Sequence, residues 1–172
     1  VKQVADNPRL GHRHRANASA QLMGVDVSTN AFNLRDAAIS AEKPPGVLRI
    51  LMLGDSLTFG WGVPVAATVS ERLETMFNDS GKAAQVINAG VGNYNTVMEV
   101  EYFLTEGQAL EPDIVVLNYF VNDAEPVPAY TDVGVLSRTS QAYVYLKSRL
   151  DVLFRQTAAR ADWATYYLDL YA

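Results

Sequence analysis

The sequence predicts an α/β domain in which helices cover a parallel sheet. The first observation is a set of three short, largely apolar runs, at residues 47–53, 85–89 and 113–119, which is typical of strands buried on both faces. The second is that helical patterns separate these runs, and the third is that each run ends in a polar or glycine-rich turn. Because parallel strands need right-handed crossover connections, this alternation favours a β-α-β-α-β unit.

Residues 1–46 lack this pattern, and we interpret them as an N-terminal extension packed on the domain that residues 47–172 form. Within the extension, Leu22, Val25 and Val27 belong to a short alternating stretch that indicates a hairpin edge. The extension closes with Lys43-Pro44-Pro45-Gly46, which is a loop signal.

The two helices between the strands begin with the same signal. Thr68 precedes Glu71, and Thr96 precedes Glu99, at the spacing of a capping box. Gly81 and Gly107 are predicted to end these helices. The apolar residues expected to face the sheet are Val69, Leu73, Met76 and Phe77 in the first helix and Val97, Val100, Phe103 and Leu104 in the second. A last amphipathic helix is predicted around residues 143–154.

Composition excludes several classes of protein. Of the 172 residues, 49% are hydrophobic and 19% are charged, and no window approaches the roughly 18 unbroken apolar residues that a membrane-spanning helix needs. The net charge of -5 provides no basic stripe for a phosphate backbone, so we expect no nucleic-acid partner. The absence of cysteine rules out disulfides, thiol catalysis and Cys-ligated metals. We expect no cofactor and no metal.

The histidines of the chain, His12 and His14, both lie in the extension. Two imidazoles on one side of an extended segment suggest a metal site, but the neighbouring Arg13 and Arg15 repel a cation. We therefore interpret this segment as a solvated basic turn.

Polar loops follow the three predicted strands, at residues 54–60, 90–95 and 122–123. Because the carboxyl ends of parallel strands meet at one edge of a sheet, these loops are expected to line one crevice. Ser56 follows the first strand before any helix has begun, which is where a nucleophilic hydroxyl is exposed. Its own N–H, an N–H from the Gly92-Asn93 turn and the side-chain amide of Asn122 are candidate donors to the oxyanion of a tetrahedral intermediate.

These loops resemble the signature blocks of the GDSL or SGNH hydrolases. Gly54-Asp55-Ser56-Leu57 resembles the first block, residues 88–96 resemble the second, and Asn122-Asp123 resembles the end of the third, in the order and spacing of the family. The resemblance covers residues 45–125. It implies a flavodoxin-like, three-layer α/β/α fold and the hydrolysis of acyl or acetyl esters.

The chain departs from the family pattern at several points. Phe120 stands where the third block usually opens with glycine. A gapless alignment places the oxyanion glycine of the family at Asn93, with Gly92 one residue earlier, and the backbone N–H of either can serve. Asp123 is expected to tie down its own loop rather than to catalyse.

The fourth block of the family, an Asp-x-x-His pair, is absent from the chain. A serine hydroxyl is a poor nucleophile without a base, so the chain by itself is expected to be nearly inactive. We expect the pair to lie beyond residue 172, in the rest of a longer protein.

The leading hypothesis is a serine esterase acting on a small-molecule or glycan ester, such as an O-acetyl group of a cell-envelope glycan. The stretch from Asn30 to Arg35 resembles the lead-in of bacterial envelope members, which favours a cell-envelope, periplasmic or secreted location, with the cytoplasm left open. The alternative is a binding or structural protein of the cell envelope that keeps the fold and has lost the catalytic pair. A third option is a flavodoxin-like nucleotide or phosphate binder that uses the same strand-end loops. Gly90-Val91-Gly92, however, lacks the rest of a dinucleotide fingerprint. The oligomeric state stays open.

Overall fold

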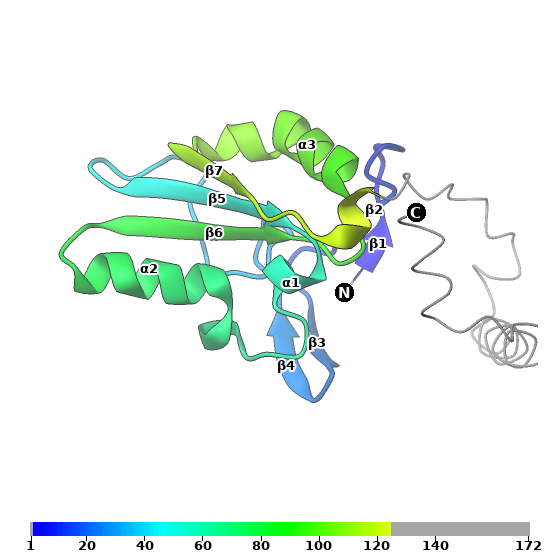
Figure 1. Cartoon of the computed structure of the whole chain (residues 1–172), viewed down its shortest axis with the longest axis horizontal. Coiled ribbons are helices and arrows are strands. Elements are labelled where there is room, and N and C mark those ends of the chain that lie inside the picture. The colour runs from blue at the N-terminus through cyan, green and yellow to red at the C-terminus, as the bar shows by residue number, and fades with distance from the viewer. Residues whose placement is uncertain (1, 125–172) are drawn as a thin grey trace, which may run out of the picture. The chain divides into compact units, whose positions relative to one another are not determined.

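A parallel three-stranded sheet lies at the centre of residues 2–124, the part of the chain that the computed structural model describes (Figure 1). Its strands lie in the order β6-β5-β7, with bounds β5 (Leu48–Gly54), β6 (Ala84–Gly90) and β7 (Ile114–Leu117). Gly54 pairs with Gly90, and Leu53 pairs with Leu117, so the three strands end at the same edge. The predicted parallel strands are confirmed. The helix predicted around residues 143–154 lies outside the described residues.

Helices cover both faces of this sheet (Figure 1). Alternate residues of a strand point to opposite sides, so a strand that is apolar at successive positions gives both faces apolar side chains to bury. The helical elements are α1 (Ser56–Phe59), η1 (Val65–Ala67), α2 (Val69–Asp79), α3 (Thr96–Thr105), η2 (Gly107–Leu110) and η3 (Val121–Ala124). On one face, α2 packs Leu73 into a cluster with Met52 of β5. On the other face, α3 packs Met98 into a cluster with Leu51 of β5. The predicted α/β/α fold is therefore confirmed, and no helix within residues 2–124 is long and apolar enough to cross a membrane.

The start of α2 follows the prediction, but its buried face does so only in part. Thr68 Oγ1 accepts a hydrogen bond from Glu71 N–H at 3.4 Å, so the predicted cap is present. Leu73 packs on the sheet as expected, together with Phe77. Val69 and Met76 are instead 56% and 68% exposed. With 3.6 residues per turn, Val69 and Met76 lie about 60° and about 80° from the centre of the row that Leu73 and Phe77 form.

Helix α3 differs more strongly from the prediction. Its N-cap is Asn95, whose Oδ1 accepts a hydrogen bond from Met98 N–H at 3.0 Å, rather than Thr96. Asn and Thr are both good caps, so the local signal did not choose between them. The buried face consists of Met98, Glu99 and Tyr102, whereas the residues predicted to be buried include three that are 43–57% exposed: Val97, Val100 and Leu104.

Strand β7 is also more exposed than predicted. Its residues Ile114, Val115 and Leu117 are 45%, 40% and 38% exposed. Among the described strands, β7 pairs only with β5, so it forms an edge of the described sheet. The apolar run therefore predicted the strand correctly, but the burial of both faces was a wrong inference for these residues.

The extension forms two antiparallel strand pairs. β1 (Lys2–Val4) pairs with β2 (His12–His14), and β3 (Ser19–Leu22) pairs with β4 (Val25–Ser28). The second pair is the predicted hairpin. Its turn, Met23-Gly24, has φ angles of 53° and 79°, and two positive values are what a type I′ turn requires.

Two buried arginines tie the extension to the sheet. Arg49 of β5 is fully buried and donates hydrogen bonds to the carbonyl oxygens of Ser40 and Ala41, at 3.1 and 2.9 Å. Arg35 of the extension donates to the carbonyl oxygens of Phe59 and Val63, which flank the end of α1. The path of the extension is therefore fixed relative to the strand ends.

Candidate active site

Ser56 begins α1 directly after β5, at the edge where the parallel strands end (Figure 1). The preceding Asp55 is 3% exposed and caps the helix, because its Oδ1 accepts a hydrogen bond from Leu57 N–H at 2.8 Å. The helix is one turn long, since Gly60 ends it in the left-handed conformation with φ of 82°. Ser56 is thus held, half-buried, on a tight strand-to-helix turn, as the first residue of the helix rather than before it.

Two glycines allow α1 to lie against the ends of the strands. A Cβ on Gly54 would stand 2.0 Å from Thr58 Oγ1, and a Cβ on Gly90 would stand 2.2 Å from the backbone nitrogen of Phe59. Neither separation is possible without a shift of the helix. The absence of a side chain at both strand ends therefore positions Ser56.

The Gly92-Asn93 turn lies beside Ser56. Tyr94 N–H donates to the carbonyl oxygen of Val91 at 3.0 Å and closes the turn, and Asn93 within it has φ of 70°. A Cβ on Gly92 would lie 3.7 Å from Ser56 Cβ, which is ordinary van der Waals contact. The structure thus brings the second predicted loop next to the predicted nucleophile.

The backbone donors around Ser56 have no acceptor inside the described part of the chain. This holds for the N–H groups of Ser56, Gly92 and Asn93. Most buried N–H groups in proteins are paired, and Gly92 is buried. Unpaired N–H groups beside a hydroxyl can bind an oxygen that carries negative charge.

The third loop approaches α1 through Asn118, whose Nδ2 donates to Thr58 Oγ1 at 3.0 Å. Asp123 lies in η3, and its Oδ2 accepts a hydrogen bond from Phe120 N–H, so the expectation that Asp123 holds its own loop is confirmed. Asn122 lies in the same turn, but its side chain is outside what the structure describes. The contact of the Asn122 amide with the other donors stays a prediction.

A buried carboxyl group that sequence reasoning missed lies on α3. Glu99 was predicted to complete a capping box, yet it is 1% exposed, and neither of its carboxylate oxygens has a hydrogen-bond partner in the described region. Burial, and to a smaller extent the carboxylates of Asp123 and Asp55, raise the pKa of Glu99 to about 8. The Glu99 carboxyl is therefore largely neutral at pH 7, close to the loops that carry Ser56.

The interpretation of the histidine segment as a solvated turn was wrong. His12 and His14 are 9% and 2% exposed, because the β1–β2 pair folds back onto the strand ends. The His14 ring packs on Phe59, with 4.8 Å between ring centroids, and the edge of the His12 ring meets Tyr94. Burial, followed by the charge of Lys2, lowers the pKa of His14 to about 4, so the imidazole is neutral at pH 7.

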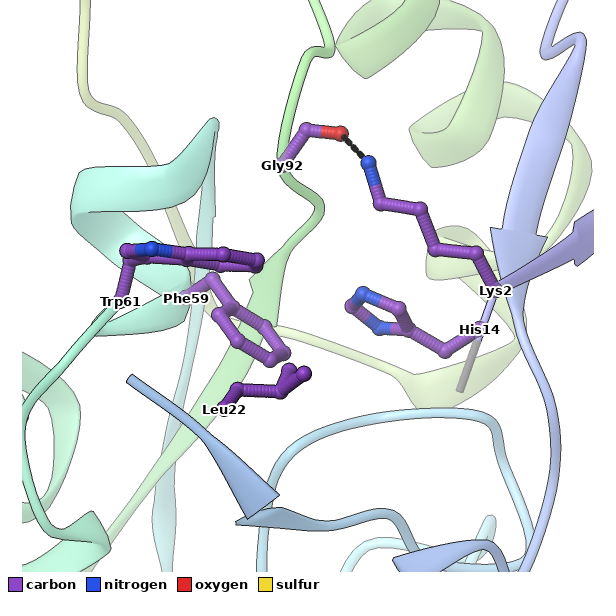
Figure 2. Close-up of a pocket in the computed structure, with 6 residues that line it drawn as sticks. All are labelled: Lys2, His14, Leu22, Phe59, Trp61 and Gly92. Atoms are coloured by element: carbon purple, nitrogen blue, oxygen red, sulfur yellow. Dashed lines mark hydrogen bonds between the residues drawn. The ribbon is translucent and has the colours of Figure 1, made fainter. Parts of the chain in front are cut away.

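A cavity of about 250 Å³ opens beside the Gly92 turn (Figure 2). The extension and the α1 region both line it, through Lys2, His14, Leu22, Phe59, Trp61 and Gly92. Figure 2 shows the apolar side chains on one side and Lys2 with His14 on the other. No local sequence signal predicted that Lys2, His14 or Leu22 lines a cavity, since each reaches it through contacts between segments far apart in the chain.

A base for Ser56 is not found within residues 2–124. In this range Ser56 Oγ meets Asp55 Oδ2 at 3.5 Å, the outer limit of a hydrogen bond, and no imidazole lies within hydrogen-bond distance of the hydroxyl. The same residues contain no cluster of three His, Asp or Glu side chains able to hold a metal ion. The described site therefore offers a hydroxyl and backbone donors, without the group that would remove the hydroxyl proton.

The sequence model of the GDSL-like Lipase/Acylhydrolase family matches residues 52–168, which include the loops around Ser56, Gly92 and Asp123. No curated protein matches the chain.

Proposed function

Because the chain belongs to the GDSL-like lipase/acylhydrolase family, a family of ester hydrolases, we propose that it carries the nucleophile and oxyanion donors of a serine esterase. Ser56 is the nucleophile. The observation that supports this best is the placement of Ser56 on the strand-to-helix turn, next to Gly92 and among N–H groups without acceptors. This combination suits attack on a carbonyl carbon.

In the proposed reaction, Ser56 Oγ forms a bond to the acyl carbon of an ester, and the carbonyl oxygen becomes an oxyanion. The N–H of Ser56, an N–H of the Gly92-Asn93 turn and the amide of Asn122 donate hydrogen bonds to that oxygen. The alcohol then leaves with a proton, and water releases the acyl group from Ser56. Removing one such donor typically lowers the rate by about 10²–10³.

The proposal includes an Asp-x-x-His pair after residue 172, whose imidazole takes the proton of Ser56 and returns it to the leaving alcohol. Within residues 2–124, the side-chain hydrogen bond of Ser56 is to Asp55 and involves no imidazole. The proposed substrate is a small-molecule or glycan ester with an acyl or acetyl group, and the proposed location is the cell envelope or the exterior of the cell.

The test is hydrolysis of a short aryl acetate, together with labelling by a fluorophosphonate, with the protein expressed to the natural ends of its reading frame. Ser56→Ala is expected to abolish both turnover and labelling. Ser80→Ala is the matched control, because Ser80 is an exposed serine at the end of α2 and its hydroxyl donates to the Phe77 carbonyl. The control is expected to keep both the turnover of the aryl acetate and the labelling by the fluorophosphonate.

A second outcome would favour the alternative function. A wild-type protein that is folded, inert toward aryl acetates and unlabelled at Ser56 would contradict the esterase proposal. A binding role for the fold, in which the Gly92 turn and the neighbouring cavity hold a ligand without chemistry, would then be the better explanation.

A further inference from the structure

The carbonyl oxygen of Gly92 is held by two side chains of the extension, Lys2 and His12, of which Figure 2 shows Lys2. Lys2 Nζ donates one hydrogen bond to it, and His12 Nε2 lies 2.9 Å from it. His12 Nε2 also lies 3.3 Å from Lys2 Nζ, and it donates to the Gly92 carbonyl in the tautomer that carries the hydrogen on Nε2. Lys2 Nζ also donates to Asn93 Oδ1 at 3.1 Å, so the extension holds both residues of the turn.

One of these side chains is buried and the other is not: His12 is 9% exposed, whereas Lys2 is an exposed residue. Lys2 lies on β1 and His12 on β2, which pair in fixed register. Tyr94 Oη donates to the His12 carbonyl oxygen at 2.6 Å, and the two rings meet edge to face with 5.2 Å between centroids. Tyr94 ends the turn that Gly92 and Asn93 form, so the strand pair and the turn are fastened to each other.

The Gly92 carbonyl and the Asn93 N–H belong to the same planar, trans peptide group. Hydrogen bonds to the carbonyl draw electron density toward its oxygen, which makes the N–H on the other side of the peptide a stronger donor. A charged donor such as the Lys2 ammonium makes such a bond stronger than a neutral one does. The same two bonds fix the orientation of the peptide plane, and therefore the direction of the Asn93 N–H.

We propose that Lys2 and His12 are positioning residues, which orient and polarise the Gly92-Asn93 peptide so that its N–H binds the oxyanion formed at Ser56. This inference rests on the proposed function, and it selects the N–H of Asn93 over that of Gly92. Since both side chains donate to the carbonyl, neither serves as the base for Ser56. The extension is thus part of the active site, although it lies before the first strand of the sheet.

The test compares four variants in the protein expressed to the natural ends of its reading frame. Lys2→Met keeps the length of the side chain and removes the ammonium, and His12→Phe keeps the ring contact with Tyr94 and removes the donor. Each is expected to lower kcat by about tenfold, less than the loss of a direct oxyanion donor, with KM nearly unchanged, because the peptide donates mainly in the transition state. His12→Gln, which restores an N–H donor, is expected to recover most of the loss.

Arg9→Gln is the matched control. Arg9 is a cation of the same extension, and it pairs with Glu101 on α3 at 3.3 Å rather than with the Gly92 turn. Its removal tests whether the loss of any positive charge in the extension lowers kcat as Lys2→Met is expected to do. Arg9→Gln is expected to keep the wild-type kcat and the wild-type labelling rate.

The rate of fluorophosphonate labelling and the ¹⁵N chemical shift of the Asn93 amide are the additional measurements. Lys2→Met is expected to slow labelling and to move the Asn93 resonance upfield, since a peptide nitrogen is deshielded when its carbonyl accepts a hydrogen bond. If Ser56→Ala abolishes turnover while Lys2→Met and His12→Phe behave like Arg9→Gln, this inference is wrong and the proposed function stands. If Ser56→Ala leaves turnover and labelling unchanged, or the wild type shows neither, both are wrong.

Discussion

Gly90 on β6 lies directly against the backbone of Phe59 on α1. A Cβ on Gly90 would stand 2.2 Å from Phe59 N and 2.8 Å from Phe59 Cα. The obstructing atoms are backbone atoms, so they cannot turn aside as a flexible side chain does. Any side chain at this position must displace the helix that begins with Ser56.

Gly90→Ala is therefore expected to destabilise the fold by about 3 kcal/mol, the upper part of the range for overpacking. Gly92→Ala is the control, because its new Cβ would meet its nearest atom at 3.5 Å, in ordinary contact. It is expected to cost less than about 1 kcal/mol. Urea unfolding of the two variants measures the difference, and equal stabilities would contradict the close approach.

Arg35 connects the extension to the end of α1. Its guanidinium donates to the carbonyl oxygens of Phe59, Gly60 and Val63, and it lies 5.0 Å from the centroid of the Phe59 ring. Arg35→Met leaves the carbonyl groups of Phe59 and Val63 without this donor, while Gly60 keeps the Val63 N–H, and the expected loss of stability is about 2–4 kcal/mol. Arg72→Met removes an exposed arginine of α2 and is expected to stay within about 0.5 kcal/mol of the wild type. Urea unfolding measures the stability of both variants. If Arg35→Met has as small an effect as Arg72→Met, Arg35 does not stabilise the contact between the extension and the end of α1.

Glu99 is expected to make the stability of the fold depend on pH. Its pKa is about 8 in the folded state, because of burial and the nearby Asp123 and Asp55, against the ordinary value of 4.5. A raised pKa means that the folded state binds the proton more tightly than the unfolded state does. The resulting stabilisation is complete below about pH 4.5 and is lost as the pH rises through about 8.

Glu99→Gln removes this titration while keeping the size and shape of the side chain. Between about pH 5 and pH 9, the Tm of the wild type is therefore expected to fall relative to that of the variant. Scanning calorimetry of both proteins across this range is the measurement. If the curves of Tm against pH are parallel for the two proteins, Glu99 ionises as readily in the folded state as in the unfolded state.

Trp61 is expected to contribute to substrate binding rather than to chemistry. It lines the cavity beside Gly92, is 47% exposed, and lies 6.2 Å from Phe59 between ring centroids. If esters with a bulky apolar group place that group in the cavity, Trp61→Ala raises their KM by about tenfold and leaves kcat nearly unchanged. The KM for an aryl acetate changes less. Met76→Ala, which removes a 68% exposed side chain of α2, is the control and is expected to change neither constant.

Much of the sheet was predictable because its signals are local. A strand covered on both faces must be apolar at successive positions, so β5 and β6 were evident as runs of the chain. The cap at Thr68 and the hairpin turn at Met23-Gly24 depend on neighbouring residues alone. Local signals also predicted that Ser56 follows a strand end, and the structure places it next to the turn that contains Gly92.

Tertiary structure decided which faces are buried. Asn95 and Thr96 are equally good caps by sequence, so the sequence did not identify the first residue of α3. The buried face of α3 was decided by the packing of Met98 and Tyr102 against the sheet. The apolar run of β7 predicted a strand, but its exposure depends on which strands lie beside it. Propensity and periodicity do not contain this information.

By itself, the sequence determined the α/β fold, the order of the strand-end loops and the family to which the chain belongs. It did not determine that the extension reaches those loops. Lys2 and His12 contact the Gly92 carbonyl across 90 and 80 residues of chain, and a carbonyl oxygen accepts from any donor that packing brings near it. The residues next to Gly92 in the sequence do not predict which distant side chain donates to its carbonyl. Only the folded structure therefore identified Lys2 and His12.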